Sequence, residues 1–151
     1  MAVIASRIDP SGEAFRANRA AMLALIDEFR ALEEQVRRTS NGRKEQFAAR
    51  GQLLPRERVA LLIDKGSPFL ELSTLAGLGM HDDDGKENVL GGGVIDGIGY
   101  VSGVRCLVSA SDSAIKGGTT APMGLKKKLR GQESARDNKL PLVQLIESGG
   151  A

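Results

Sequence analysis

The sequence has very few of the side chains that most active sites use for acid–base, nucleophilic or redox chemistry. Of its 151 residues, one is cysteine, one is histidine, none is tryptophan, and only 3% are aromatic. The single cysteine, Cys106, excludes an intramolecular disulfide and a metal site built from cysteines. The single histidine, His81, has no partner pattern nearby, and Ser148 lacks the G-x-S-x-G context of a hydrolase nucleophile. We therefore expect the chemistry of this chain to depend on its backbone.

The chain also lacks an excess of charge and any long apolar run. Its 21 Lys and Arg against 19 Asp and Glu give a formal net charge of +2, which argues against a nucleic-acid-binding protein. No stretch approaches the roughly 20 apolar residues that a membrane-spanning helix needs. The N-terminus has neither the apolar core of a signal peptide nor the acid-poor composition of a transit peptide. We expect no nucleic-acid or membrane partner, and a cytoplasmic location, with the mitochondrial matrix as the alternative in a eukaryote.

The polar loop over residues 77–88 is a poor candidate for a metal site. It contains His81 and the run Asp82-Asp83-Asp84-Gly85. Lys86 stands where a calcium-binding loop requires its third oxygen ligand. The spacing therefore predicts a solvated loop, and no metal is expected.

Glycine, in contrast, is abundant, with 19 residues where a usual share of about 7% would give about half as many. Gly117 and Gly118 precede a predicted helix, and Gly149 and Gly150 follow a predicted strand. Both pairs are suited to present backbone N–H groups to an anion or to a developing oxyanion. The helix between them carries Lys126, Lys127, Lys128 and Arg130, which form either a solvated face or contacts to the phosphates of a ligand such as coenzyme A.

Apolar spacing predicts an α/β chain that begins with a long helix over residues 13–38. Its apolar side chains form one narrow seam, consisting of Phe15, Met22, Leu25, Phe29, Leu32 and Val36. This seam packs either on its own domain or on another chain. Further helices are predicted over 43–50, 55–64 and 120–138, and strands over 69–72, 94–100, 104–109 and 142–146.

Two of these strand predictions carry more detail. The strands over 94–100 and 104–109 flank Ser102-Gly103, the composition of a hairpin turn. The strand over 142–146 is an almost continuous apolar run, which is typical of a strand buried on both faces. A buried strand followed by a glycine turn normally leads into a covering helix, so we expect this chain to be a truncated piece of a longer domain.

From about Arg50 onward the sequence resembles the carboxyltransferase (beta) subunit of biotin-dependent acyl-CoA carboxylases. The resemblance rests on segments that follow the family's order and approximate spacing: residues 50–58 (RGQLLPRER), 66–71 (GSPFLE), 91–95 (GGGVI), 111–118 (SDSAIKGG) and 147–151 (ESGGA). The amino-acid sequences of the first two segments are similar to those of the methylcrotonyl-CoA and geranyl-CoA branch of the family.

This resemblance implies a partial crotonase-like fold made of βαβ units. Residues 1–50 would be an N-terminal helical arm, and residues 51–151 the N-terminal part of the carboxyltransferase N-domain. Gly149 and Gly150 would donate backbone hydrogen bonds to the enolate oxygen of the substrate. Gly117 and Gly118 would belong to the loop around coenzyme A and its thioester, with Lys126, Lys127 and Arg130 as phosphate contacts.

The resemblance also implies an activity and partners. The family transfers a carboxyl group from carboxybiotin to the alpha or vinylogous carbon of an acyl-CoA. Biotin would be carried by a biotin carboxylase/biotin carrier (alpha) subunit, and beta subunits would assemble as a homo-oligomer. The alternative is a non-catalytic module that binds coenzyme A or pairs with other subunits. In both cases we expect the 151-residue chain to be inactive alone, because the second domain is missing.

Overall fold

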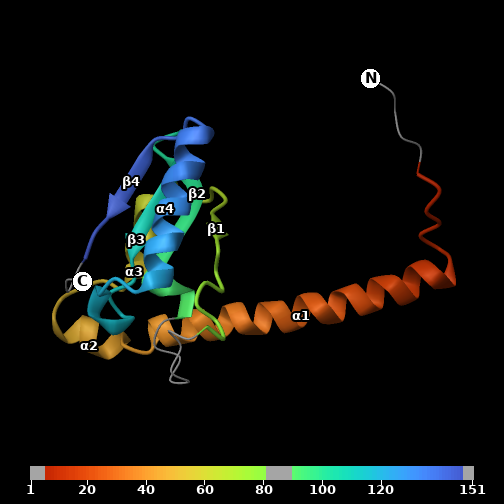
Figure 1. Cartoon of the computed structure of the whole chain (residues 1–151), viewed down its shortest axis with the longest axis horizontal. Helices are drawn as coiled ribbons and strands as arrows, with labels where there is room; N and C mark the ends of the chain where they lie inside the picture. The colour runs from red at the N-terminus through yellow and green to blue at the C-terminus, as the bar shows by residue number, and fades with distance from the viewer. Residues whose placement is uncertain (1–5, 81–89, 148–151) are drawn as a thin grey trace. The chain divides into compact units, whose positions relative to one another are not determined.

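The computed structural model of the chain describes residues 6–80 and 90–147 (Figure 1). The chain forms two compact units, residues 1–34 and 35–151, which are described separately below. His81 and the acidic run after it lie outside the described residues, as do Gly149 and Gly150.

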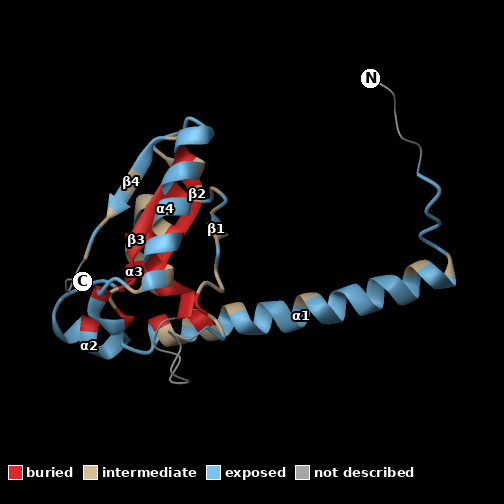
Figure 2. Cartoon of the chain, in the orientation of Figure 1, coloured by how far each residue is buried: buried red, intermediate tan, exposed pale blue. Residues whose placement is uncertain are grey.

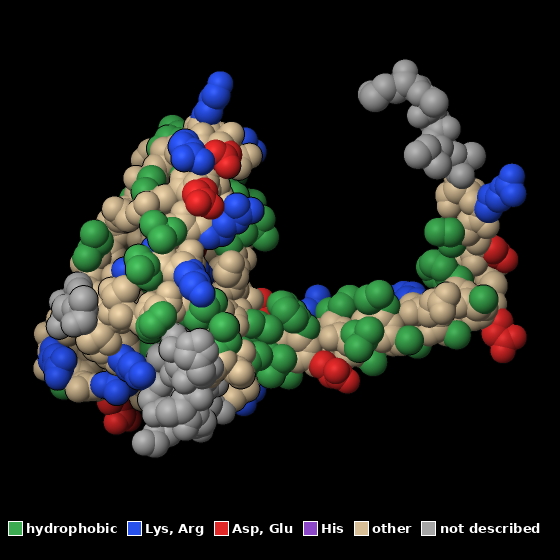
Figure 3. All heavy atoms as spheres, viewed as in Figure 1, with side chains coloured by type: hydrophobic (Ala, Val, Ile, Leu, Met, Phe, Trp, Pro, Cys, Tyr) green, Lys and Arg blue, Asp and Glu red, His purple; other side chains and the backbone are tan. Residues whose placement is uncertain are grey.

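The first unit consists mainly of the helix α1 (Glu13–Asn41), whose last turns belong to the second unit. The middle of its apolar seam is exposed, since Met22, Leu25 and Phe29 keep 57%, 59% and 48% of their surface, whereas Val36 at the end of the seam is buried. Figure 3 shows hydrophobic side chains gathered on the surface of α1. The predicted helix is confirmed, and the structure leaves both packing alternatives for its seam open.

The second unit is built on a four-stranded sheet in the order β1-β2-β3-β4, with β1 (Leu70–Leu72), β2 (Val94–Val101), β3 (Val104–Ser111) and β4 (Leu142–Leu145). The first three strands are antiparallel, and β3 and β4 are parallel. The parallel pair is joined by the helix α4 (Pro122–Asp137), so β3, α4 and β4 form one βαβ unit. The expected α/β architecture is confirmed.

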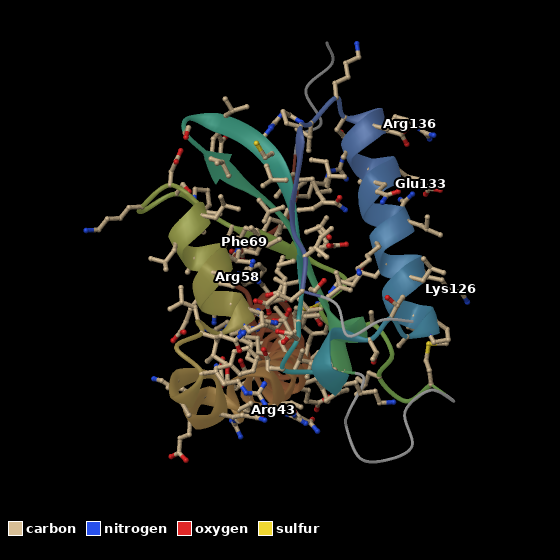
Figure 4. All side chains as sticks on the ribbon, turned by 90° about the vertical axis from the view of Figure 1, so that its left-hand side faces the viewer. Arg43, Arg58, Phe69, Lys126, Glu133 and Arg136 are labelled. Atoms are coloured by element: carbon tan, nitrogen blue, oxygen red, sulfur yellow. The ribbon has the colours of Figure 1, made fainter. Side chains whose placement is uncertain are left out.

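The two helices α3 (Pro55–Leu62) and α4 cover opposite faces of the sheet (Figure 4). Val59 of α3 packs in a buried cluster with Ile95, Cys106, Val108 and Ala110. The alternate residues of β2 and β3 point to the other face, toward α4. Figure 2 shows that the buried residues concentrate on β2 and β3 between these helices.

A close contact with Phe69 explains the two glycines of β2. A Cβ atom at Gly97 would overlap the ring of Phe69, and one at Gly99 would lie 3.0 Å from it. The two glycines therefore allow the ring to pack directly on the strand backbone, as their shared face predicts.

The predicted hairpin is present, and its turn is held by a side chain from outside it. Ser102 and Gly103 have φ values of 52° and 77°, which suit a two-residue turn that follows the twist of the strands. The Asp64 carboxylate accepts hydrogen bonds from the backbone N–H groups of both residues, each at 2.7 Å. Asp64 follows α3 and therefore ties that helix to the hairpin.

We expect the free energy of unfolding of the Asp64→Ala variant to be about 1–2 kcal/mol lower than that of the parent chain. The substitution removes two charge-assisted hydrogen bonds at a partly solvated site. Urea unfolding would measure the difference. Asp64→Asn retains one acceptor oxygen and should lose about half as much. Equal stability of Asp64→Ala and the parent chain would show that the turn does not depend on this carboxylate.

Two predictions about α4 and β4 are wrong in detail. The strand β4 is not buried on both faces, since Leu142 is exposed and Val143 and Leu145 are half-buried. It lies at the edge of the sheet, and no described residue pairs with its outer side. The helix α4 begins at Pro122 rather than at the predicted residue 120. Within the described ranges, no helix is long and apolar enough to cross a membrane.

Candidate functional site

A cavity of about 540 Å³ lies in the second unit, where β3 and β4 end. Because the carboxyl ends of parallel strands meet at one edge of a sheet, the loops that follow them come together there. The lining residues come from the helix α2 (Lys44–Ala49) and its flanks, from the loop after β3 and from the residue after β4: Arg43, Gln46, Phe47, Arg50, Gln52, Ser113, Gly117 and Glu147.

The first of the two glycine pairs contacts the end of β4. A Cβ atom at Gly118 would lie 2.5 Å from the carbonyl oxygen of Glu147, so only glycine permits this approach. Lys116, Gly117 and Gly118 all have positive φ values (46°, 65° and 80°), a conformation that favours glycine. Gly117 lines the cavity, and the Gly118 N–H donates to the Ile115 carbonyl at 3.0 Å within the turn.

Glu147 is held by two partners at the end of β4. Arg58 of α3 forms an ion pair with it at 2.7 Å, and the Ser113 hydroxyl donates to its other carboxylate oxygen. These contacts join α3, the loop after β3 and the residue that immediately precedes the Ser148-Gly149-Gly150 segment. The segment itself lies outside the described residues, so its predicted oxyanion donors remain a prediction.

Arg43 and Arg50 are site residues that the sequence analysis missed, because both fall in the segment assigned to the helical arm. Phe47, buried between them on α2, packs with Leu54 and with Ala114 of the loop after β3. This small cluster fixes α2 against the cavity and places both guanidinium groups on its wall. With Glu147 already paired to Arg58, the wall carries an excess of positive charge, which favours an anionic ligand.

The cationic helix face is not uniform. Lys126 and Arg130 are exposed, and Figure 4 shows Lys126 pointing away from the sheet. Lys127 is only 5% exposed, and its ammonium donates to the carbonyl oxygens of Gly91 and Val94 at 3.1 and 2.6 Å. Neither alternative for this cluster describes Lys127, because its buried ammonium donates to backbone carbonyls rather than facing solvent or a phosphate. Helical spacing places it with Gly124, Gly131 and Ala135 on the buried face of α4.

Lys127 connects α4 to the site loop through a glycine turn. Gly91, Gly92 and Gly93 have φ values of 71°, 68° and 63°, and Gly92 lies against the backbone of Gly124. The Gly93 carbonyl accepts a hydrogen bond from Asp112 at 2.9 Å, at the start of the loop after β3. Burial lowers the pKa of Lys127 to about 8, although nearby Asp96 and Glu71 oppose this effect. Burial has the opposite effect on an acid, and it raises the pKa of Asp112.

A half-buried ion pair supports the same region. Arg56 of α3 contacts Glu71 of β1 through two hydrogen bonds of 2.8 and 2.9 Å. Burial raises the pKa of Glu71, but the paired guanidinium lowers it more, so that the carboxyl group titrates below its usual range. Among the described residues, no group of three or more His, Cys, Asp and Glu side chains is arranged to hold a metal ion.

Comparison with known proteins gives consistent matches. Residues 46–151 match the carboxyl transferase domain family. The chain is 45% identical over 151 residues to the probable mitochondrial methylcrotonoyl-CoA carboxylase beta chain of Drosophila melanogaster, covering 99% of this chain and 25% of that protein. It is 52% identical over 108 residues to the biotin-dependent 3-methylcrotonyl-coenzyme A carboxylase beta1 subunit of Mycobacterium tuberculosis, covering 72% and 20%.

Solved structures agree. The beta subunit of P. aeruginosa geranyl-CoA carboxylase superposes with a TM-score of 0.86 at 58% identity, over 98% of this chain and 27% of that one. The transcarboxylase 12S structure, at 23% identity and a TM-score of 0.75 over 86% and 26%, shows the fold alone. The predicted partial crotonase-like fold and the predicted family resemblance are confirmed. The chain spans about a quarter of the length of these relatives.

Proposed function

Since this chain belongs to the carboxyl transferase domain family of acyl-CoA carboxylase beta subunits, we propose that its 540 Å³ cavity binds the acyl-CoA substrate of a carboxyl transfer. The observation that carries the proposal is the contact of the Gly117–Gly118 loop with Glu147 in a cavity lined by Arg43 and Arg50. Anionic phosphates suit Arg43 and Arg50 through charge-assisted hydrogen bonds. The cavity has the size of typical small-molecule sites.

In this proposal the glycine loops act through their backbone. Gly149 and Gly150 donate N–H hydrogen bonds to the thioester oxygen as an enolate forms, and Gly117 and Gly118 shape the loop around the thioester. Preorganised donors of this kind stabilise developing negative charge without a histidine. Arg58 and Ser113 orient Glu147 and so position the segment that follows it. Lys126 and Arg130 are further candidates for phosphate contact, whereas the buried ammonium of Lys127 already donates to two carbonyls.

The whole subunit's activity extends beyond this chain. When bound, carboxybiotin supplies the carboxyl group, and we propose that it comes from a biotin-carrying alpha subunit to a homo-oligomer of beta subunits. The acceptor is the alpha or vinylogous carbon of an acyl-CoA of the methylcrotonyl or geranyl class, as the names of the relatives suggest. We place the protein in the cytoplasm or, in a eukaryote, in the mitochondrial matrix. The predicted division into an arm of residues 1–50 and a domain from residue 51 remains part of this proposal.

Isothermal calorimetry with coenzyme A tests the cavity assignment. Arg43→Gln and Arg50→Gln should each weaken binding about fivefold, because each removes one charge-assisted phosphate contact. The control is Arg105→Gln, an exposed arginine of β3 that does not line the cavity, which should bind as the parent chain does. Equal affinity of all three variants and the parent would refute the assignment, as would the absence of any binding by the parent chain.

The exposed seam of α1 favours a second candidate, a non-catalytic module that pairs with other subunits. Carboxyl transfer by the purified chain, with carboxybiotin and methylcrotonyl-CoA, would favour the catalytic function. Self-association that is lost in a Leu25→Gln variant, without coenzyme A binding, would favour the pairing module.

A further inference from the structure

A second cavity, of about 220 Å³, lies between α4 and the strands β1 and β2. Its wall includes Leu72, Asp96, Lys127, Arg130, Gly131 and Ser134. None of its lining residues also lines the cavity proposed for acyl-CoA. Arg130 is also a candidate phosphate contact in the proposed function, but Asp96, Lys127 and Gly131, which carry the inference below, have no part in it, so the inference does not rest on the proposed function.

Asp96 is the least expected residue of this cavity. It is 1% exposed, and neither of its carboxylate oxygens accepts a hydrogen bond of normal geometry from the described residues, although the Ser109 hydroxyl lies close enough to interact. Burial raises its pKa, while Ser109 and the charge of Lys127 oppose that rise in part. A buried acceptor without a donor is strongly unfavourable, and native proteins rarely keep one. The Ser109 hydroxyl, opposite Asp96 on β3, can donate at most one hydrogen bond, so at least one of the two Asp96 oxygens requires a donor that the described residues do not supply.

Gly131 leaves the space that such a donor would use. A Cβ atom at this position would lie 2.8 Å from Asp96 Oδ2 and 3.7 Å from Leu107 Cδ2. Glycine inside a helix is less favourable than alanine, so its presence in α4 needs a local reason. The reason visible in the structure is the carboxylate of Asp96 directly opposite.

The charges on the wall determine which donors fit. Two N–H groups of the Lys127 ammonium are used by the Gly91 and Val94 carbonyls, which leaves one of its three donors. Arg130 also lines the cavity, and its contact with Glu133, at 3.5 Å, is exposed. Two cationic groups disfavour a metal ion or an ammonium ligand. They favour a ligand that combines an acid group with a neutral hydroxyl donor.

We propose that this cavity binds a small hydroxy acid of three or four carbons. Its hydroxyl group donates to Asp96, its carboxylate accepts from Lys127 and Arg130, and its carbon chain lies against Leu72. At about 30 Å³ for each water-sized group, the cavity accommodates about seven heavy atoms, which is the size of such a molecule.

The proposal is tested by NMR titration of the ¹⁵N-labelled, full 151-residue chain with three probes. 3-Hydroxybutyrate carries both groups, butyrate lacks the hydroxyl, and 1,3-butanediol lacks the carboxylate. We expect 3-hydroxybutyrate to shift the amide signals of Gly131 and Ser134 and to bind at least tenfold more tightly than either analogue. Equal binding of 3-hydroxybutyrate and butyrate would overturn the proposal, and so would no shift with any probe.

Two variants and a control locate the binding. Asp96→Asn retains the shape of the side chain and should weaken 3-hydroxybutyrate binding about tenfold. Gly131→Ala places a methyl group beside Asp96 and should abolish binding of 3-hydroxybutyrate. Because alanine is more favourable than glycine in a helix, the variant should still fold. The control is Arg136→Gln, at an exposed position of α4 outside the cavity, and should bind normally. Unchanged affinity in Gly131→Ala would overturn the proposal even if Asp96→Asn does not fold.

Discussion

The Gly118→Ala variant should be less stable than the parent chain by about 3 kcal/mol and should lose coenzyme A binding at least tenfold. The φ value of 80° at this position costs an L-residue about 1–2 kcal/mol. The added Cβ would also lie 2.5 Å from the Glu147 carbonyl, a backbone atom that cannot move without displacing the end of β4. Urea unfolding and calorimetry with coenzyme A would measure the two effects.

The neighbouring Gly117 provides a matched control. Its φ value of 65° is similar, but a Cβ atom there would meet nothing within 4 Å. Gly117→Ala should therefore lose only the stability that the positive φ value costs an L-residue, about 1 kcal/mol. Any change in its coenzyme A binding should come from the altered wall of the cavity. If the two variants were equally stable, the contact between Gly118 and Glu147 would not constrain the site.

The Lys127→Met substitution should lower the free energy of unfolding by about 3 kcal/mol more at pH 10.5 than at pH 7.5. The unfolded chain keeps the Lys127 proton up to a pKa near 10.5, whereas the folded chain releases it at a pKa of about 8. Between these values the unfolded state binds more protons, so the parent chain gains stability as the pH rises. Methionine does not titrate and cannot show this gain.

Near pH 7 two effects of this substitution oppose each other. Methionine removes the cost of burying a charge, but it leaves the Gly91 and Val94 carbonyls without a donor. The informative quantity is therefore the difference in unfolding free energy between variant and parent, measured at pH 7.5 and again at pH 10.5. Subtracting the parent chain's free energy of unfolding at each pH removes the contribution of the other lysines.

Lys126→Met serves as the control, since Lys126 is the adjacent residue of α4 and is exposed. Its stability relative to the parent should be within about 0.5 kcal/mol at both pH values. A difference for Lys127→Met that is the same at both pH values would show that the Lys127 ammonium is not buried against the glycine turn.

Local patterns were sufficient for most of the second unit. The alternation around Ser102-Gly103 predicts the hairpin because a two-residue turn sets its register, and the structure pairs Val101 with Val104. Pro55 and Pro122 predict helix starts because proline is preorganised for the first turn. The order and approximate spacing of the resembling segments predicted the family.

Burial and side-chain direction were decided by tertiary contacts. Lys126 and Lys127 are adjacent residues of the same type, but their positions differ by about 100° around α4. Lys126 therefore faces solvent, and Lys127 faces the Gly91–Gly93 turn. Arg43 and Arg50 became site residues only because Phe47 packs against Leu54 and Ala114. The apolar run of β4 predicted burial, yet its edge position leaves it exposed among the described residues.

The scarcity of histidine, cysteine and aromatic residues already indicated a protein that works through its backbone, and the glycine pairs indicated where. Sequence alone determined the elements, their order and the family, because these depend on contacts between residues near in the chain and on ordered motifs. The tertiary structure decided which charges are buried and which glycines are required. Gly131 illustrates the reason: it is unfavourable within its helix and becomes understandable only beside Asp96, 35 positions earlier in the chain.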